Sequence, residues 1–272
     1  MTTDLETWGM DIAQGPHLPP TLRVLRYHLF TYLRTWRSSL TVSFLAPVLY
    51  LAAMGVSLGS LINKHVGPVD HVSYLSFVAP GLLASSAMQV ASTDSMYPVM
   101  AAIKWVRTYF AMLATPLRVR DVLLGHLAWV TVRLVLTAGI YLGVMAAFGT
   151  VHSPLAVLAL PAAILTGLSF AAAISAFAAT QENDQGFATL SRMGLVPLFL
   201  LSATFFPLRQ LPGWMHPLAY ATPLFHGVEL CRMLALGTVD WTSALWDVAY
   251  LSALSAVGVV LARRSFTKRL VV

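Results

Sequence analysis

The stretch Leu155–Thr180, LAVLALPAAILTGLSFAAAISAFAAT, runs for 26 residues without a charged side chain. An α-helix needs about 20 apolar residues to cross the hydrocarbon core of a bilayer. Soluble domains have roughly a quarter of their residues charged, whereas this 272-residue chain has 10% charged and 57% hydrophobic residues. Because so little polar surface cannot cover a soluble globule, the chain is predicted to be an integral membrane protein.

Similar runs elsewhere predict an all-α polytopic fold with six transmembrane helices. The spans are expected at about residues 39–62, 72–93, 116–148, 155–180, 193–206 and 243–262. The fifth run has only 14 residues before Pro207, a rise of about 21 Å as a helix, so it must tilt, continue past the proline or thin the bilayer. Residues 21–272 form one membrane domain, after a polar N-terminal tail at residues 1–20.

The basic residues predict the orientation. With both termini inside, thirteen Lys and Arg residues fall in inner segments, and three fall in outer segments: Lys64, Arg209 and Arg232. The positive-inside rule therefore predicts a multi-pass protein of the cell (inner or plasma) membrane with both termini cytoplasmic. The formal net charge of +6 reflects this topology, and nucleic acid is not an expected partner.

Residues 21–38 are predicted to form an amphipathic helix in the headgroup layer. Its apolar stripe comprises Leu22, Leu25, Leu29, Leu33 and Trp36, and its basic flank comprises Arg23, Arg26, Arg34 and Arg37. Such a helix places its cations near anionic lipid. Two interpretations remain open: an anchor on membrane lipid alone, or an anchor that also contacts a partner.

A basic segment at residues 101–121 separates the second and third spans. Its charged residues are Lys104, Arg107, Arg118, Arg120 and Asp121. Helical spacing of apolar residues from Ile103 predicts a short helix that ends at Thr115, since the residue before a proline avoids the α region. Thr115 and Pro116 then cap and begin the third span. Arg118 and Arg120 could simply obey the positive-inside rule, but so long a connector favours a docking surface.

Residues 207–237 are too apolar for a free loop, and four prolines prevent a continuous helix. Non-spanning backbone in a membrane must pack on protein or line a cavity, so an outer re-entrant pair of short helices is expected. Thr222 caps the second helix and Gly237 ends it. On this helix His226, Glu229 and Arg232 share one face, and Glu229 and Arg232 are expected to pair and fix an outer gate. The alternative is an exposed pair without such a role.

One cation lies inside a predicted span. His126, Trp129 and Arg133 fall on one face of the third span, where the cation could pack on the indole. Charged groups in the membrane usually face protein or water. These three residues are therefore either candidates for a translocation path or, for Arg133, a structural cation buried against neighbouring helices.

The stretch LVPLFLLSATFFPLRQLPGWMHPLAYATPLFHGVELCR, at residues 195–232, resembles type-2 ABC exporter permeases. The resemblance rests on a small-residue span, FFP, LPGW, TPL.H and an Arg six residues after the His. The wording is most similar to the nodulation lipo-oligosaccharide permeases, and the six-span plan extends the likeness over most of the chain. Thr204 departs from the pattern, since a smaller residue is usual there.

The resemblance implies a dimer with a second permease copy or a sister permease. Each permease would dock on a separate ABC ATPase subunit, through residues 101–121 as coupling segment and residues 21–38 as interface helix. ATP and Mg would bind the ATPase, and no cofactor or metal is expected here, because the chain has no G-x-x-x-x-G-K-[ST] phosphate loop. The chain is thus expected to be a transport subunit without enzyme activity of its own.

The resemblance further implies outward movement of a lipid-linked saccharide or another amphiphile. An amphiphilic drug exporter of the same family is the alternative. Among other classes, a proton-coupled secondary transporter is disfavoured because no Asp or Glu lies deep in a predicted span. An intramembrane lipid-modifying enzyme or an assembly subunit has still less support, since neither H-E-x-x-H nor G-x-S-x-G is present.

Overall fold

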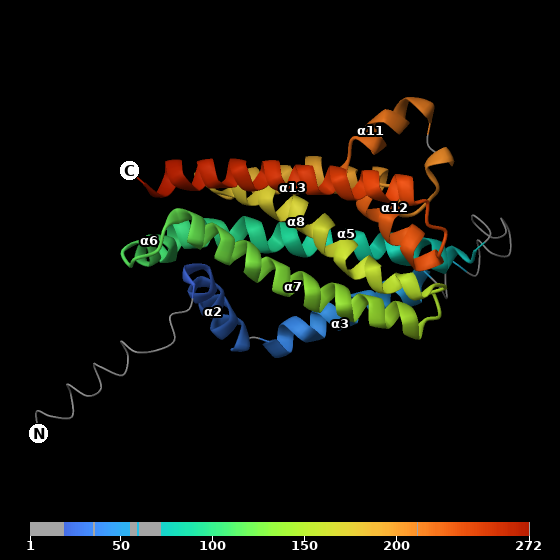
Figure 1. Cartoon of the computed structure of the whole chain (residues 1–272), viewed down its shortest axis with the longest axis horizontal. Coiled ribbons are helices and arrows are strands. Elements are labelled where there is room, and N and C mark those ends of the chain that lie inside the picture. Colours follow the sequence, from blue (N-terminus) through green and yellow to red (C-terminus); the bar gives the residue numbers. More distant parts are fainter. Residues whose placement is uncertain (1–18, 35, 55–58, 60–71, 211, 272) are drawn as a thin grey trace, which may run out of the picture.

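A computed structural model describes residues 19–34, 36–54, 59, 72–210 and 212–271 (Figure 1). Within these ranges the elements are helices joined by turns, which confirms the all-α fold. Most of the expected N-terminal tail, the end of the first expected span and Lys64 lie outside the described residues.

The long helices are α3 (Trp36–Ala52), α5 (Tyr74–Met100), α7 (Val119–Ala147), α8 (Ala159–Ala178) and α13 (Trp241–Leu270). The shorter ones are α2 (Pro20–Leu33), α6 (Thr108–Leu113), α9 (Gln185–Thr189), α10 (Val196–Leu201), α11 (His216–Tyr220) and α12 (Pro223–Leu236). Two π-helical turns, Ala101–Trp105 and Leu190–Leu195, extend α5 and join α9 to α10, and 3-10 turns lie at Pro154–Leu158, Leu208–Gln210 and Gly213–Met215.

Four of the described helices are long and apolar enough to cross a membrane: Tyr74–Trp105, Val119–Ala147, Pro154–Ala178 and Trp241–Leu270. They match four expected spans, although the first extends twelve residues beyond residue 93. The fifth expected span, 193–206, is misplaced at both ends, because its apolar helix covers Gln185–Leu201. The helix stops there since the backbone turns at Ala203, whose φ is 56°. The total of six spans stays a prediction.

Helix α8 lies at the centre of the bundle and packs against α5, α7, α12 and α13 (Figure 1). Its sequence is rich in Ala, Gly and Ser, which lets neighbouring backbones approach closely where lipid removes the hydrophobic driving force between helices. The approach of α12 is the tightest of these: a Cβ on Gly227 would lie 2.3 Å from Thr166 Oγ1 of α8. The missing side chain of Gly227 in α12 therefore lets this helix approach Thr166 of α8.

The bundle has two distinct ends. Helix α6 and the C-terminal part of α13 lie at one end, and α11 with α12 lies toward the other (Figure 1). The first end is called the basic end, and its cations are Lys104, Arg107, Arg118, Arg120, Arg263, Arg264, Lys268 and Arg269. The second is called the hairpin end, formed by the described part of residues 207–237. The chain thus separates its basic segment from its proline-rich segment along the long axis.

The N-terminal amphipathic helix is shorter than expected. Helix α2 ends at Leu33 with Arg34 at its C-cap, and α3 begins at Trp36, so residues 21–38 form two elements and Arg37 belongs to α3. The expected stripe is largely exposed, with Leu33 at 61%, whereas Val24 is buried and packs against α7 at Gly125. The leucine stripe and the face that contacts α7 are therefore on different sides of α2.

The contact of α2 with α7 generates a stability prediction. A Cβ on Gly125 would lie 2.4 Å from Val24 Cβ, so Gly125→Ala must push α2 away or shift α7. Overpacking of this kind costs about 1–3 kcal/mol, and the loss is measured as a lower unfolding midpoint in detergent. Gly139→Ala is the matched control, because a Cβ at Gly139 meets nothing within 4 Å and alanine favours helix. Equal midpoints for the two variants would contradict the close approach.

Candidate functional site

The hairpin end is built around α12, whose two ends form as the sequence predicts. Thr222 Oγ1 accepts a hydrogen bond from Phe225 N–H (3.3 Å) and caps the helix, and Gly237 ends it with a φ of 78°. Along its length α12 is largely buried against α5, α8 and α13. Because α12 is covered by these helices, its polar side chains contact protein groups on the neighbouring elements.

Arg232 is the most extensively bonded cation of α12. Its Nη1 donates to Glu229 Oε2 (3.1 Å), as the sequence predicts, but its Nε also donates to the Phe77 carbonyl of α5 (3.2 Å) and its Nη2 to the Ala203 carbonyl (2.7 Å). The guanidinium carbon lies 3.9 Å from the centre of the Phe77 ring. Arg232 therefore joins α12, α5 and the turn after α10, which exceeds the expected pair.

The turn after α10 is held from both sides. Ala203 has a left-handed backbone, which costs free energy for a residue other than glycine, and Arg232 bonds its carbonyl. On the other side, Thr204 Oγ1 lies 2.8 Å from Ser202 Oγ and 3.3 Å from Ser85 Oγ of α5. Thr204, the departure from the family pattern, thus supplies a hydroxyl that anchors the turn to α5.

His226 has a partner that the sequence did not predict. Its Nδ1 lies 2.7 Å from Asp247 Oδ1 of α13, and its Nε2 lies 2.9 Å from the Tyr220 carbonyl of α11. Both ring nitrogens thus lie within hydrogen-bond distance of an oxygen from another helix. The Tyr250 ring packs 4.2 Å from the imidazole, centre to centre. His226 therefore links α11, α12 and α13.

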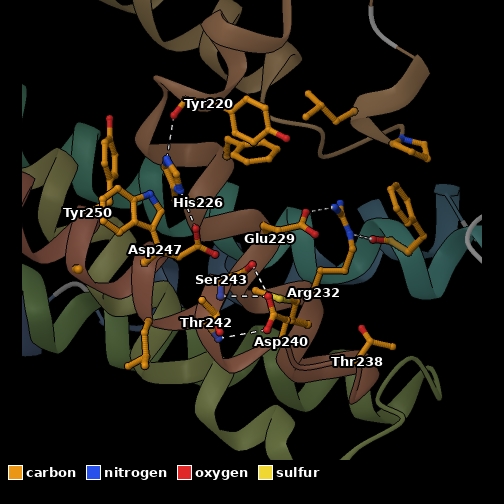
Figure 2. A pocket seen from close by; sticks show the side chains of 18 residues that line it. Tyr220, His226, Glu229, Arg232, Thr238, Asp240, Thr242, Ser243, Asp247 and Tyr250 are labelled. Atoms are coloured by element: carbon orange, nitrogen blue, oxygen red, sulfur yellow. Dashed lines mark hydrogen bonds and ion pairs between the residues drawn. The ribbon is translucent and has the colours of Figure 1, made fainter.

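These residues line a cleft of about 1350 Å³ between α12, the first turns of α13 and the segment before α12 (Figure 2). Glu229 and Arg232 form one part of its lining, and His226 with Asp247 forms another. Asp240, at the start of α13, accepts hydrogen bonds from Ser243 Oγ (2.6 Å) and from the N–H groups of Thr242 and Ser243. These bonds, led by that of the Ser243 hydroxyl, lower the pKa of Asp240.

A second polar cluster lies at the basic end. Glu182, between α8 and α9, pairs with Lys104 and with Arg269 Nη1 of α13, the latter at 2.6 Å. Hydrogen bonds from Arg269 and Lys104 lower the pKa of the Glu182 carboxyl from 4.5 to about 2, so Glu182 stays charged at neutral pH. One carboxylate thus ties together the ends of two long helices and the loop between α8 and α9.

The expected coupling segment differs from its prediction in two ways. Its first helix is broken: the π turn that extends α5 ends at Trp105, Arg107 has a φ of 58°, and α6 follows. The Thr115 hydroxyl donates to the Met112 carbonyl (2.6 Å) and closes α6, so Thr115 does not cap the third span, and Pro116 precedes it.

The third span starts at Val119 because Asp121 Oδ2 accepts the Arg118 N–H (3.0 Å). Lys104 and Asp121 therefore have structural partners inside the chain. Arg107, Arg118 and Arg120 remain exposed at the surface of the basic end.

The candidates for a translocation path in α7 lie beneath α2. The His28 ring of α2 stacks on Trp129 with an interplanar angle of 11° and meets His126 edge to face, both at 5.9 Å. Arg133 Nε donates to Asp94 Oδ2 of α5 (3.0 Å), and its guanidinium lies 5.3 Å from the Tyr32 ring centre. These contacts favour the structural interpretation of Arg133. The sequence missed Asp94 because its expected span stopped one residue earlier.

Comparison with known proteins assigns the chain to a family. The profile described as ABC-2 type transporter matches residues 21–236. The chain belongs to the ABC-2 type transporter family. The matched region begins in α2 and ends with the last residue of α12, so the ABC-2 region includes the basic segment, the hairpin and Arg232, whereas α13 lies outside it.

Individual relatives of this ABC-2 chain cover most of its length. Nodulation protein J of Rhizobium meliloti is 32% identical over 80% of this chain and 81% of its own. Nodulation protein J of Rhizobium leguminosarum bv. trifolii is 35% identical over 74% of this chain and 77% of its own. The inner membrane transport permease YadH of Escherichia coli is 23% identical over 77% of this chain and 80% of its own.

The bonding of Arg232 generates a prediction that separates it from its partner. Arg232→Gln removes the bonds to the carbonyls of Phe77 in α5 and Ala203 in the turn after α10 and leaves Glu229 without its cation, so we expect a loss of about 3–5 kcal/mol of unfolding free energy. Glu229 is 39% exposed in its side chain, and Glu229→Gln should cost about 0.5 kcal/mol. Denaturant unfolding in detergent measures both, with exposed Arg209→Gln as control.

A charge-swapped double variant adds a further check. A carboxylate at position 232 would face the carbonyls of Phe77 and Ala203, which repel it, so the swap should not restore the stability lost in Arg232→Gln. Restoration by the swap would show that only the pair with Glu229 matters.

Proposed function

We propose that this chain is the permease subunit of an ATP-driven exporter that moves an amphiphile with a saccharide headgroup outward. The observation that carries the proposal is the ABC-2 family match over residues 21–236, which includes the exposed Arg107, Arg118 and Arg120 and the hairpin helix α12 that lines the cleft. The substrate class rests on the sequence resemblance to lipo-oligosaccharide permeases. An amphiphilic drug is the alternative substrate within the family.

The basic end supports docking of a separate ABC ATPase. Arg107, Arg118 and Arg120 are exposed there, and so are the apolar side chains of Trp105 (59%) and Val106 (70%). Exposed apolar groups rimmed by charges are typical of protein interaction sites. The ATPase would bind ATP and Mg, and this chain would contribute no catalytic residue.

Two carboxylates lie within the long helices, and such groups are what the alternative, a proton-coupled carrier, would use. Asp94 lies in α5 and Asp247 in α13, and both are largely buried. The sequence places no Asp or Glu deep in an expected span, but Asp94 lies in the helix Tyr74–Trp105, which continues past the expected end at residue 93. Each carboxylate pairs with a basic side chain, Asp94 with Arg133 and Asp247 with His226, so both have contacts that hold helices together and do not depend on proton transport.

The other partners follow from the same proposal. The termini would lie in the cytoplasm, the hairpin end would face outward, and a second permease copy or a sister permease would complete the path. Exposed Arg26 and Arg34 of α2 suit contact with anionic membrane lipid.

The first experiment tests the energy source. The purified permease is expected to show no ATP turnover, and in proteoliposomes with its ATPase it should export a saccharide-headed amphiphile only when ATP is hydrolysed. Export is measured as substrate accessible to an outer-face glycosidase. Export that survives an inactive ATPase but collapses when the proton gradient is dissipated would overturn the proposal.

The second experiment tests the docking surface. Arg118→Glu with Arg120→Glu should reduce co-purification of the ATPase about tenfold or more, because several charge contacts are reversed at one interface. Arg209→Glu, at the hairpin end, is the control and should leave co-purification unchanged. Undiminished co-purification of the double variant would exclude these arginines from the interface.

Orientation must be verified in the same variants, since arginines also set topology. The single native cysteine, Cys231, is buried, so it cannot report sidedness and stays silent to a membrane-impermeant thiol reagent. Trp214→Cys, at a position 74% exposed in the hairpin, should be labelled from outside intact cells. Val106→Cys at the basic end should be labelled only after the membrane is opened.

A further inference from the structure

The cleft at the hairpin end contains a buried acceptor without a donor. Asp247 Oδ1 is taken by His226, but Asp247 Oδ2 is buried and has no hydrogen-bond partner among the described residues. The whole residue is 5% exposed and lines the cleft. Buried polar atoms are nearly always bonded, so an oxygen left over at the wall of a cleft indicates a place for a hydrogen-bond donor from a ligand.

The charges of the cleft favour donors over anions. Its lining includes three carboxylates, of Glu229, Asp240 and Asp247, against one guanidinium and one imidazole. The guanidinium of Arg232 is directed at Glu229 and at two backbone carbonyls, and the imidazole of His226 is directed at Asp247 and Tyr220. The carboxylates would therefore repel a phosphate or carboxylate ligand. Hydroxyl and amide N–H groups of a ligand could instead donate hydrogen bonds to them.

Aromatic rings complete the lining. Trp246 is 70% exposed and Tyr220 53%, and both line the cleft with Tyr250 and Phe225. The flat faces of such rings pack well against apolar faces that carry partly positive C–H groups, as the ring faces of a pyranose do. Leu245, 68% exposed beside Trp246, offers an apolar surface continuous with the cleft for an acyl chain.

We propose that this cleft binds the saccharide headgroup of the exported amphiphile, an inference that rests on the proposed function. Hydroxyl groups of the sugar donate to Asp247 Oδ2 and to the exposed side of the Glu229 carboxylate, and Trp246 packs on a sugar face. The volume of about 1350 Å³ exceeds the roughly 300–1,000 Å³ of sites for drug-sized ligands, which suits more than one sugar unit. The geometry assigns a neutral, hydroxyl-rich headgroup to this site.

The test measures binding without ATP or transport. The permease in phosphatidylcholine nanodiscs is dialysed against radiolabelled hexyl β-maltoside, with empty nanodiscs subtracted, and hexyl phosphate serves as the anionic probe. The maltoside should bind, and hexyl phosphate should bind at least about tenfold more weakly, because it meets unpaired acceptors. Equal or tighter binding of hexyl phosphate would overturn the assignment.

Two variants locate the bound sugar. Trp246→Ala should weaken maltoside binding about fivefold or more, since one aromatic contact is lost. The matched control is Trp241→Ala, which removes the same side chain at 61% exposure from the same helix but outside the cleft lining, and it should bind as the unaltered protein does. Equal weakening by both variants, or by neither, would overturn the site.

Asp247→Asn probes the buried acceptor itself. It should weaken binding about tenfold, and because it also alters the contact with His226, it is interpreted only with an unfolding midpoint near that of the unaltered protein. If that midpoint falls, the binding measurement on Trp246→Ala decides whether the sugar binds in the cleft.

A sugar bound in the cleft could belong to the exported substrate or to a glycolipid that stays bound to the permease. Export assays in proteoliposomes distinguish these two cases. Trp246→Ala should raise the substrate concentration for half-maximal export and leave ATPase co-purification unchanged. An unchanged half-maximal concentration, despite weakened maltoside binding, would show a site for resident glycolipid and overturn the cargo assignment. ATP-driven export with no maltoside binding would reject this inference and leave the proposed function standing. Maltoside binding without ATP-driven export would reject the proposed function and leave a sugar site in the cleft.

Discussion

The hairpin end depends on one buried cation. A guanidinium taken from water is costly unless its donors are satisfied, and Arg232 satisfies three of them with groups from different parts of the chain: Glu229, Phe77 and Ala203. The fork geometry of arginine makes this possible, since its donors point in fixed and different directions. A lysine would supply the charge but could not hold α5, α12 and the turn after α10 in one arrangement.

The cleft is a consequence of this constraint. With α12 fixed to α5 on one side and to α8 through Gly227 on another, its remaining polar residues face the start of α13, where His226 meets Asp247. Helix α13 is continuous from Trp241 to Leu270, so Asp247 and Arg269 lie about 33 Å apart along one helix. The same helix thus contributes a carboxylate to the cleft and a cation to the Glu182 cluster at the basic end.

Sequence reasoning predicted what depends on neighbours along the chain. The caps Thr222 and Gly237, the pair of Glu229 with Arg232 and four long helices are local features, and the structure contains all of them. The end of α5 was misplaced, because an uncharged run locates a hydrocarbon-length segment and this helix continues beyond it. The third span is slightly shorter than expected, since it begins at Val119 and ends at Ala147.

Long-range pairs could not be predicted in this way. Asp94 with Arg133, and Glu182 with Lys104 and Arg269, join residues far apart in sequence. Their contact depends on which helices pack together, and a pattern read along one stretch of sequence does not determine that choice. The sequence shows Asp247 near the start of an expected span, but its partner, His226, is identified only by the packing of α12 on α13.

Helix α2 has two different faces, one with exposed leucines and one that contacts α7. The exposed leucines and the face that contacts α7, with Val24 and His28, lie about 120° apart around the helix. Burial lowers the pKa of His28 to about 4, so its ring is neutral at neutral pH and can stack on Trp129 without burying a charge. A helix held sideways by protein keeps its leucines available to lipid, and its attachment to α7 does not compete with its anchoring in the membrane.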